Sequence, residues 1–396
     1  MEFFKVTPVA DAIEILKQSF DISFKTKKVA LTKAKGKISA FDIYSRINIP
    51  SFDKSIVDGY ALRSQDTLGA SDSIPAMLTF AGSVSMGNVP DFSISAGEAA
   101  YIPTGGALPQ GADAVIMIEH TDKVSDLVCV YKPLAYNENV AKIGDDIGKG
   151  ERLICKGSKL SAFDIGILAG AGQSYVEVLQ PTAYIIATGD ELQRGKKLEK
   201  AKIFDSNSEM LAGLLADMGV SEAGRVQIED KPEELIAEIK KGNQLADFVI
   251  VTGGSSVGER DFTADCIIEA GGAILIKGLA LKPGKPTIVA SLQNKPIFGL
   301  SGNPVSAAVA FLLLAPAILS AGKQVSFFAK AGINFASTPG RLTFQPVTVK
   351  QGQAYPVLGK SGILSTLTMA DGYLLIEEKI EGINKGEDVE VFLFNG

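Results

Sequence analysis

The residues best suited to chemistry lie in short loops that follow apolar stretches in the second half of the chain. They include the carboxylates Glu191 and Asp261, the lysines Lys282 and Lys285, and a helix start at 301–306. Lysines and a helix N-terminus attract a phosphate or another oxyanion. Carboxylates beside that anion repel it unless a hard cation bridges them, and Mg²⁺ binds through one or two carboxylates together with ligand phosphates. The pattern therefore predicts a Mg²⁺-dependent site for a phosphorylated or nucleotide-bearing ligand, without identifying that ligand.

The loop at 252–258, TGGSSVG, has the highest density of glycines and hydroxyls among these segments. It follows an apolar run at 247–251 and precedes a helix-like segment at 262–270. Glycines let a backbone approach an anion closely and aim its N–H groups at it. A strand, a Gly/Ser loop and a helix start form a common phosphate cradle of open α/β sheets. Because the loop is neither a Walker A nor a GxGxxG motif, an ordinary tight turn explains this stretch equally well when it is taken alone.

Carboxylates and hydroxyls also gather in turns of the first half of the chain, at 48–63, 101–106 and 137–147. The third turn contains the adjacent carboxylates Asp145 and Asp146, which repel each other unless a cation or a lysine neutralises them. On residue types alone, polar turns with side-chain hydrogen bonds are the favoured interpretation of these segments.

The chain contains a single histidine, His120. A histidine metal cluster is therefore excluded, and proton transfer or metal binding is expected to depend on carboxylates, lysines and hydroxyls. The cysteines Cys129, Cys155 and Cys266 are scattered without CxxC spacing, which excludes a cysteine zinc site and predicts three core thiols in a reducing cytoplasm.

Composition limits the possible partners. The formal net charge of −6 gives no bulk attraction to nucleic acid. The N-terminal residues lack the features of a signal peptide. The longest apolar run, 307–319, is too short to span a bilayer and contains Pro316, so it is expected to form a buried helix rather than a membrane anchor.

The elements that must position the loops alternate between β and α from residue 183 onwards. Strands are predicted at 183–187, 247–251, 273–276, 287–290 and 296–300. Helices are predicted at 7–20, 162–169, 207–218, 232–241, 262–270 and 304–319. This alternation predicts a doubly wound α/β domain, with its ligand at the carboxyl edge of the sheet. Alternating apolar runs at 74–132 and after residue 326 predict a β-rich region and a small β-barrel.

Taken together, these segments resemble the MoeA family of molybdopterin molybdenumtransferases, to which the E domain of gephyrin is similar. The resemblance covers almost the whole chain and rests on motifs that occur in the family's order: PSFDKSIVDGYALR, PTGGALPQGADAVIMIE, NENVAKIGDDI, ATGDEL, DSN, TGGSSVGERDFT, LKPGKP and GLSGNPVS.

The resemblance implies the last step of molybdenum cofactor assembly. Adenylylated molybdopterin and molybdate would bind as substrates, the link to AMP would be cleaved, and molybdenum would be placed on the dithiolene sulfurs. It also implies Mg²⁺ as cofactor, an elongated homodimer in the cytoplasm, and a MogA-like molybdopterin adenylyltransferase as the partner that supplies the substrate.

The site residues implied by the resemblance are carried over by motif position. Those expected to be catalytic are Asp58, Thr104, Asp146, Glu191, Asp230 and Asp261, with Glu191 and Asp261 at the metal. Those expected to bind substrate or phosphate are Thr188, Gly189, Asp190, Gly253, Gly254, Ser255, Ser256, Gly258, Lys282, Lys285, Ser301, Gly302, Asn303, Pro304 and Ser306. Asp58, Thr104 and Asp146 would reach in from the β-rich domain, of the same or of a second subunit, on the molybdate and pterin side.

The fold implied by the resemblance is an α/β multidomain chain with a MogA-like doubly wound domain. Its expected parts are an N-terminal helix at 1–22 on the α/β domain, an elongated domain made of 23–45 plus 150–178, a β-rich inserted domain at 46–149, the α/β molybdopterin-binding domain at 179–326, and a C-terminal β-barrel at 327–396.

The chain departs from the family pattern at a few positions. Ser301 replaces a usual proline, which is expected to loosen that turn, while Ser208 and the segment 141–143 stand where arginines are common. Two other functions remain open at this point: a molybdopterin adenylyltransferase, which does not require residues 46–149, and a non-catalytic scaffold that binds pterin or partners.

Overall fold

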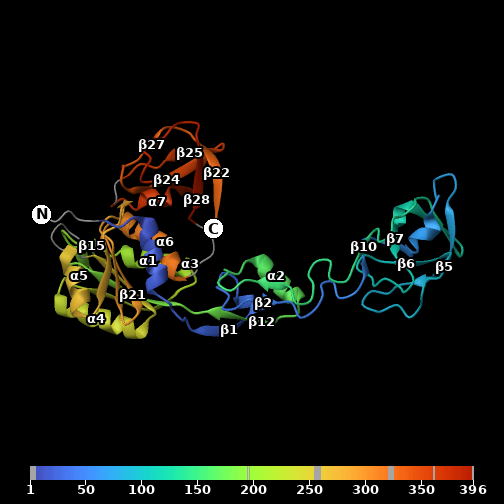
Figure 1. Cartoon of the computed structure of the whole chain (residues 1–396), viewed down its shortest axis with the longest axis horizontal. Coiled ribbons are helices and arrows are strands. Elements are labelled where there is room, and N and C mark those ends of the chain that lie inside the picture. The colour runs from blue at the N-terminus through green and yellow to red at the C-terminus, as the bar shows by residue number, and fades with distance from the viewer. Residues whose placement is uncertain are drawn as a thin grey trace. The chain divides into compact units, whose positions relative to one another are not determined.

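The computed structural model describes residues 6–193, 195, 197–253, 260–319, 325–359 and 362–394, and it describes Arg260 and Asp261 by their backbone alone. The chain forms two compact units, whose elements are labelled in Figure 1. The larger unit comprises residues 1–41, 156–161 and 175–396, and the smaller unit comprises residues 42–155 and 162–174.

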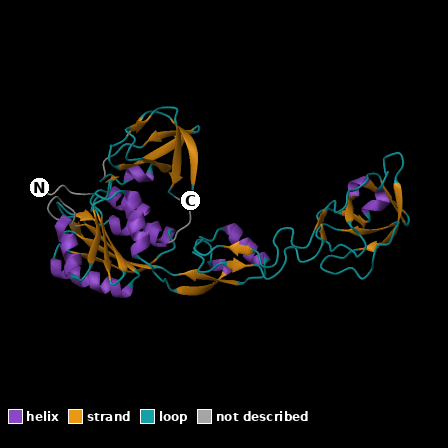
Figure 2. Cartoon of the chain, viewed as in Figure 1, coloured by secondary structure: helices purple, strands orange, loops and turns teal. Residues whose placement is uncertain are grey.

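A mixed β-sheet forms the centre of the α/β part of the larger unit (Figure 2). Within the described residues its strand order is β16-β13-β17-β21-β20-β18. The strands are β13 (Thr182–Thr188), β16 (Ser221–Ile228), β17 (Phe248–Gly253), β18 (Ala273–Lys277), β20 (Ile288–Leu292) and β21 (Lys295–Leu300). The central strands β13, β17 and β21 are almost wholly buried, as expected for strands covered on both faces.

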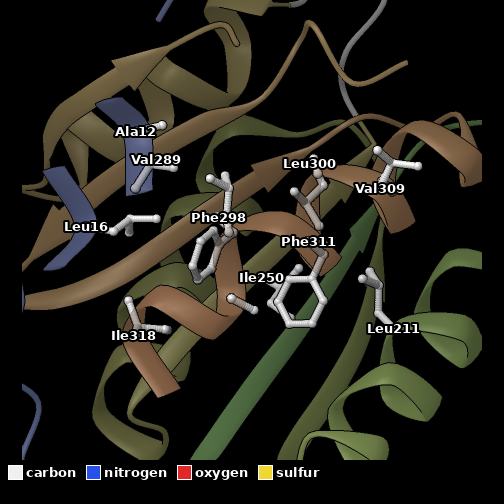
Figure 3. Packing of buried hydrophobic residues seen from close by; sticks show 14 of the residues in the cluster. Ala12, Leu16, Leu211, Ile250, Val289, Phe298, Leu300, Val309, Phe311 and Ile318 are labelled. Atoms are coloured by element: carbon white, nitrogen blue, oxygen red, sulfur yellow. The ribbon is translucent and has the colours of Figure 1, made fainter. Parts of the chain in front are cut away.

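Helices cover both faces of this sheet. On one face pack α1 (Val9–Ser19), α3 (Asn207–Asp217) and α6 (Pro304–Leu319), and on the other pack α4 (Pro232–Leu245) and α5 (Arg260–Glu269). Figure 3 shows the first face, where Phe298 of the sheet meets Phe311 of α6 with ring centroids 5.9 Å apart and planes nearly perpendicular. The predicted doubly wound α/β domain is confirmed.

Strand directions bring several loops to one edge of the sheet. β16, β13, β17 and β21 are parallel, β20 is antiparallel to β21, and β18 is antiparallel to β20. β18 therefore runs in the same direction as the parallel strands, and its following loop opens at their carboxyl edge. The chain passes from β13 outward to β16 and then returns to β17, so the topological switch point lies between β13 and β17, where ligands of such sheets bind.

Some sequence predictions about elements were wrong. Strand β16 was not predicted, because it lies at the sheet edge and none of its residues is buried, so its sequence carries no apolar run. Helix α1 begins at Val9 rather than at residue 7, and α4 continues to Leu245. The cysteines are not all core thiols, since Cys266 is buried whereas Cys155 is exposed.

The C-terminal residues form a closed β-barrel, in which β24 pairs with both β25 and β26 and the ring continues through β22 and β28. These strands are β22 (Ser326–Ala331), β24 (Leu342–Lys350), β25 (Gln353–Pro356), β26 (Gly372–Ile376) and β28 (Asp388–Leu393). Tyr373 stacks between Phe344 and Phe392, with centroid distances of 4.3 and 5.5 Å. The predicted barrel is confirmed. Smaller elements of this region are α7 (Ser365–Thr368) and the paired strands β23 (Phe335–Ala336) and β27 (Gly382–Ile383).

The smaller unit is β-rich, as predicted. Its main sheet, in the described residues, has the order β7-β4-β6-β5-β9-β8. The strands are β4 (Gly59–Leu62), β5 (Ala76–Ser83), β6 (Glu98–Ile102), β7 (Ala114–Met117), β8 (Thr121–Val124) and β9 (Leu127–Val130). The unit also contains α2 (Ala162–Gly170) and the strand pairs β3 (Lys54–Ser55) with β10 (Val140–Ala141) and β2 (Ile43–Tyr44) with β11 (Arg152–Ile154).

Two segments distant in sequence also pair in the larger unit, where β1 (Thr26–Ala30) runs antiparallel to β12 (Tyr175–Leu179). This pairing and the β2–β11 pair join residues from both pieces of the predicted two-segment domain. Among the described residues, the helices are either too short or too polar to cross a lipid bilayer.

Candidate active site

A pocket of about 360 Å³ opens at the carboxyl edge of the α/β sheet, at the switch point between β13 and β17. Its wall is made by the ends of these strands, by the starts of α3 and α6, and by a short flap. The lining residues are Ala187, Thr188, Glu191, Leu192, Ile203, Phe204, Asp205, Ser206, Asn207, Thr252, Gly253, Gly302, Asn303, Pro304 and Gly362.

Two helices begin at this pocket. Ser206 and Asn207 form the start of α3, and Asn303 and Pro304 form the start of α6. The first N–H groups of a helix have no partner within it, and the helix dipole adds partial positive charge there. Two such ends at one pocket make it a strong site for a phosphate or another oxyanion.

Asn207 connects three parts of the wall. Its Nδ2 donates hydrogen bonds to Thr252 Oγ1 at 2.8 Å and to the Gly302 carbonyl at 3.0 Å. These acceptors fix which end of the amide is nitrogen, because an amide oxygen in that place would face two oxygens. The Oδ1 of Asn207 is buried and has no hydrogen-bond partner within the described part of the chain. It is an acceptor beside the pocket, whereas the helix ends supply donors.

Two carboxylates lie on the pocket wall. Glu191 folds back over the preceding loop, so that a Cβ at Gly189 would come within 2.7 Å of its carboxylate. Asp205 accepts a hydrogen bond from the Ser208 N–H at 3.0 Å and so satisfies the first turn of α3.

The oxygen atoms of this wall suit a hard cation. Glu191, Asp205 and the unpartnered Oδ1 of Asn207 provide carboxylate and amide oxygens, the ligand types that Mg²⁺ accepts. Within the described residues there is no group of three or more His, Cys, Asp or Glu side chains placed to hold a metal. The side chain of Asp261, the second predicted metal ligand, lies outside the described part of the structure.

Asp190 and Asp230 are not among the residues that line the pocket, and Asp190 is exposed. The Thr188 hydroxyl donates to the Asp230 carboxylate at 2.5 Å, and the Asp230 N–H donates to the Asp190 carboxylate at 3.1 Å. These bonds tie the loop after β13 to the loop after β16. The structure therefore gives Asp230 a hydrogen bond that orders Thr188, and its catalytic role stays a prediction.

A short flap, which the sequence analysis did not assign to the site, forms one side of the pocket. It pairs β14 (Leu192–Gln193) with β15 (Ile203–Phe204), and the Ile203 N–H donates to the Glu191 carbonyl at 2.8 Å. The side chains of Ile203 and Phe204 remain about half exposed at the pocket. Exposed apolar side chains next to the lysine-rich stretch 195–202 were the available signal, but strands of two residues leave no periodicity to detect.

The loop with the two predicted lysines opens at the same sheet edge. Lys282 lies in β19 (Leu281–Lys282), and its Nζ donates to Thr338 Oγ1 of the barrel region at 2.6 Å. Lys285 is half-buried, and its carbonyl accepts from the N–H groups of Leu279 and Thr287. Neither lysine is among the pocket-lining residues.

Ser301, which was predicted to loosen the turn before α6, is buried. Its hydroxyl accepts a hydrogen bond from the Asn303 N–H at 3.2 Å. Ser306, in the first turn of α6, is also buried. The predicted residues Gly254, Ser255, Ser256 and Gly258 lie outside the described residues.

The smaller unit gathers its predicted residues in three adjoining loops. Asp58 and Thr104 lie side by side, because the Thr104 N–H donates to the Asp58 carboxylate at 2.7 Å. Asp146 is exposed on the third loop, and its N–H donates to the Ile49 carbonyl at 3.0 Å. Asp58 and Thr104 are thus exposed neighbours, and Asp146 lies on a loop that contacts the segment around Ile49.

An ion pair between Asp53 and Lys142 fastens two of these loops. Lys142 Nζ lies 2.5 Å from the Asp53 carboxylate, which also accepts the Ile143 N–H at 2.9 Å. Burial raises the pKa of Asp53, but the hydrogen bonds from Lys142 and Ile143 and the charge of Lys142 outweigh it, so the net pKa is lowered. Lys142, in the segment where arginines are common in the family, is thus engaged with Asp53.

Three family profiles match successive parts of the chain. The profile described as the MoeA N-terminal region, domains I and II, matches residues 7–172. That described as a probable molybdopterin binding domain matches residues 184–320. The MoeA C-terminal region, domain IV, matches residues 329–394.

Similar sequences cover nearly the full chain. A putative molybdopterin biosynthesis protein of Methanocaldococcus jannaschii is 37% identical over 391 residues, which are 96% of this chain and 95% of the relative. A molybdopterin molybdenumtransferase of Staphylococcus aureus is 32% identical over 404 residues, covering 98% of this chain and 95% of the relative.

Solved structures agree with these matches. Two crystal structures of molybdopterin biosynthesis MoeA proteins from Pyrococcus horikoshii superpose with TM-scores of 0.79 and 0.86, at 38% and 32% sequence identity. The first covers 99% of this chain and the second 98%, and in both cases 100% of the solved chain is covered.

Proposed function

The chain belongs to the MoeA family of molybdenum cofactor biosynthesis enzymes, the molybdopterin molybdenumtransferases, and from this premise we propose that it inserts molybdenum from molybdate into adenylylated molybdopterin with release of AMP. In this reaction the phosphoanhydride that joins the molybdopterin phosphate to AMP is hydrolysed, and the dithiolene sulfurs become ligands of molybdenum.

The observation that supports this proposal best is the pocket at the switch point. Two helix starts, at Asn207 and Asn303, provide donors and positive potential for the substrate phosphates. Glu191 and Asp205 place negative charge on the same wall. A pocket with both backbone donors and carboxylates suits a phosphoanhydride whose oxygens are held by the donors and whose charge is neutralised by a cation bound to the carboxylates.

Mg²⁺ would be held by Glu191, with the Asp205 carboxylate and the Asn207 amide oxygen close by and with Asp261 as a second proposed ligand. When bound, it would supply charge neutralisation between the carboxylates and the substrate phosphates.

The remaining residues have proposed roles on the two sides of the substrate. Lys282 and Lys285 would hold oxyanions. Asp58, Thr104 and Asp146 are our candidates for the molybdate and pterin side, where carboxylates can accept or deliver protons as oxygen leaves molybdate.

Gly189, Gly253 and Gly302 let backbone or side-chain atoms approach closely at the pocket. A Cβ at Gly253 would lie 1.8 Å from the Thr188 carbonyl oxygen, so glycine is required there. We further propose a cytoplasmic homodimer that receives its substrate from a MogA-like adenylyltransferase.

The direct test is AMP release by the purified full-length protein, supplied with adenylylated molybdopterin, molybdate and Mg²⁺. AMP should appear only when both Mg²⁺ and molybdate are present, and Glu191→Gln should reduce the rate at least about tenfold through loss of a carboxylate at the phosphates. Glu199→Gln, an exposed carboxylate change near the flap, is the matched control and should leave the rate unchanged. Absence of AMP release despite substrate binding would refute the proposal, and ATP-dependent adenylylation of free molybdopterin would replace it with the adenylyltransferase function.

A further inference from the structure

We propose that Thr338, in the C-terminal barrel region, is a positioning residue for Lys282, and this inference rests on the proposed role of Lys282 in holding a substrate oxyanion. The Lys282 ammonium group donates a hydrogen bond to Thr338 Oγ1 at 2.6 Å. These residues are 56 positions apart in the sequence. The contact joins the barrel region to the loop that carries Lys282.

Thr338 is itself held firmly. Its N–H donates to Thr343 Oγ1 at 3.3 Å, and its carbonyl accepts the Arg341 N–H at 3.2 Å. The preceding residue, Ser337, donates its N–H to the Glu381 carbonyl at 3.1 Å. Because both sides of Thr338 are tied to the barrel, its hydroxyl oxygen is a fixed acceptor.

The backbone of Lys282 is fixed from two directions. On one side β19 runs parallel to β24, and the Leu342 N–H donates to the Ala280 carbonyl at 2.8 Å. On the other side Thr7 exchanges backbone hydrogen bonds with Gly278 and Ala280, at 3.0 and 2.8 Å. Only the four-carbon stem of Lys282 therefore remains to be ordered, and Thr338 orders it.

The chemistry of the ammonium group suits this arrangement. A lysine has three N–H donors, so the bond to Thr338 leaves two for an oxyanion. A lysine that is already ordered loses less conformational entropy when its ligand binds. The expected gain from one preorganised side chain is roughly two- to tenfold in affinity.

A second part of the barrel region also reaches the site. Gly362 lines the pocket, and a Cβ there would lie 3.5 Å from Asn303 Oδ1 at the start of α6. The barrel region thus contacts the site at the helix start and at the lysine loop, which are the two places proposed to bind anions.

The test compares Thr338→Val, which removes the hydroxyl at nearly constant shape, with Thr338→Ser, which keeps it. Thr348→Val makes the same chemical change within β24, where Thr348 pairs with Tyr355 of β25, and this variant controls for barrel stability. All variants are full-length proteins. Their melting temperatures are measured first, and that of Thr338→Val should lie within about 2 °C of wild type, because a single exposed hydrogen bond is removed.

Two measurements distinguish which oxyanion Lys282 holds. The first is calorimetric titration with AMP in the presence of Mg²⁺, and the second is the molybdate dependence of AMP release. Thr338→Val should raise the AMP Kd or the molybdate KM roughly two- to tenfold, while kcat stays within about twofold. The reason is that the contact of Lys282 with the oxyanion is weakened equally in the bound state and in the transition state. Thr338→Ser should retain the wild-type values, and Thr338→Val should add no further loss to Lys282→Met.

Three results would overturn the inference: unchanged AMP and molybdate values in Thr338→Val, equal losses in Thr338→Val and Thr338→Ser, or additive losses with Lys282→Met. Calorimetric titrations with AMP and with molybdate do not depend on turnover. Together they test the positioning role even if the wild-type protein releases no AMP, which is the result that would refute the proposed function instead.

Discussion

Replacing Asn207 by aspartate should damage the pocket more than any single change of similar size. The new side chain has the same shape but cannot donate to Thr252 Oγ1 and to the Gly302 carbonyl. Two hydrogen bonds of about 1 kcal/mol each are lost and a carbonyl loses its donor, which together cost about 2–4 kcal/mol of unfolding free energy. The residue is only 8% exposed, so water cannot replace the lost donors.

The same substitution should weaken anion binding separately from stability. Like charges about 8 Å apart, at an effective dielectric constant of about 20, repel by about 2 kcal/mol. Because 1.4 kcal/mol corresponds to a factor of ten, the AMP Kd of Asn207→Asp should rise at least about tenfold. Urea unfolding gives the first quantity, and calorimetric titration with AMP in the absence of Mg²⁺ gives the second.

Asn243 provides a matched control in the same domain. It is 3% exposed, its Nδ2 donates to Gln293 Oε1 at 3.1 Å, and its Oδ1 is also buried without a partner. It does not line the pocket. Asn243→Asp should therefore destabilise the fold by about 1–3 kcal/mol and leave AMP affinity unchanged. If both variants lose AMP affinity equally, or if Asn207→Asp loses none, the electrostatic argument for the pocket is incorrect.

Three further predictions follow from single sites. Gly253→Ala should cost more than about 2 kcal/mol of stability, because the new Cβ would overlap a carbonyl oxygen and the φ of this residue is +107°. Gly340→Ala, at φ +77° with open space around it, should cost about 1 kcal/mol. Urea unfolding compares the two variants, and equal costs would contradict the overlap. Asp53→Asn should lower the unfolding free energy by about 1 kcal/mol at pH 7. The folded-state pKa of Asp53 lies below its ordinary 3.8, so this difference should be present above pH 3.8 and should disappear as the pH falls through the lower folded-state pKa. Unfolding curves at pH 7 and pH 2.5 measure it, and a difference that persists at pH 2.5 would contradict the ion-pair explanation. In thiol titration at pH 8, exposed Cys155 should react quickly and Cys266 only on unfolding, because burial raises the pKa of Cys266 to about 11; rapid labelling of both would show that the core opens readily.

Local sequence patterns predicted the architecture of the α/β domain well. The strand predicted from the apolar run before Gly253 corresponds to β17, and the helix start predicted at Asn303–Pro304 corresponds to the start of α6. The edge strand β16 was missed because none of its residues is buried, so its sequence contains no apolar run. Glycine and proline act through the backbone of their own segment, so their signals can be read without the fold.

The site was predicted less completely. Thr188, Glu191 and Gly253 line the pocket, as expected from motif positions. Phe204 was not assigned to it because a strand of two residues has no periodicity, and Gly362 was not assigned because a lone glycine in another domain carries no local signal. In the smaller unit, Asp58 and Thr104 are in contact, whereas Asp146 contacts Ile49 through its backbone.

Motif order and hydrophobic periodicity were enough to indicate the family, the doubly wound sheet and the barrel, since each depends on residues close together in the chain. Hydrogen-bond partners were not predictable in this way. Asn207 meets Thr252 and Gly302 across 45 and 95 residues of sequence, and Lys282 meets Thr338 across 56. Such pairs form only after strands and helices have packed, because the direction and distance of each polar group are set by the assembled backbone.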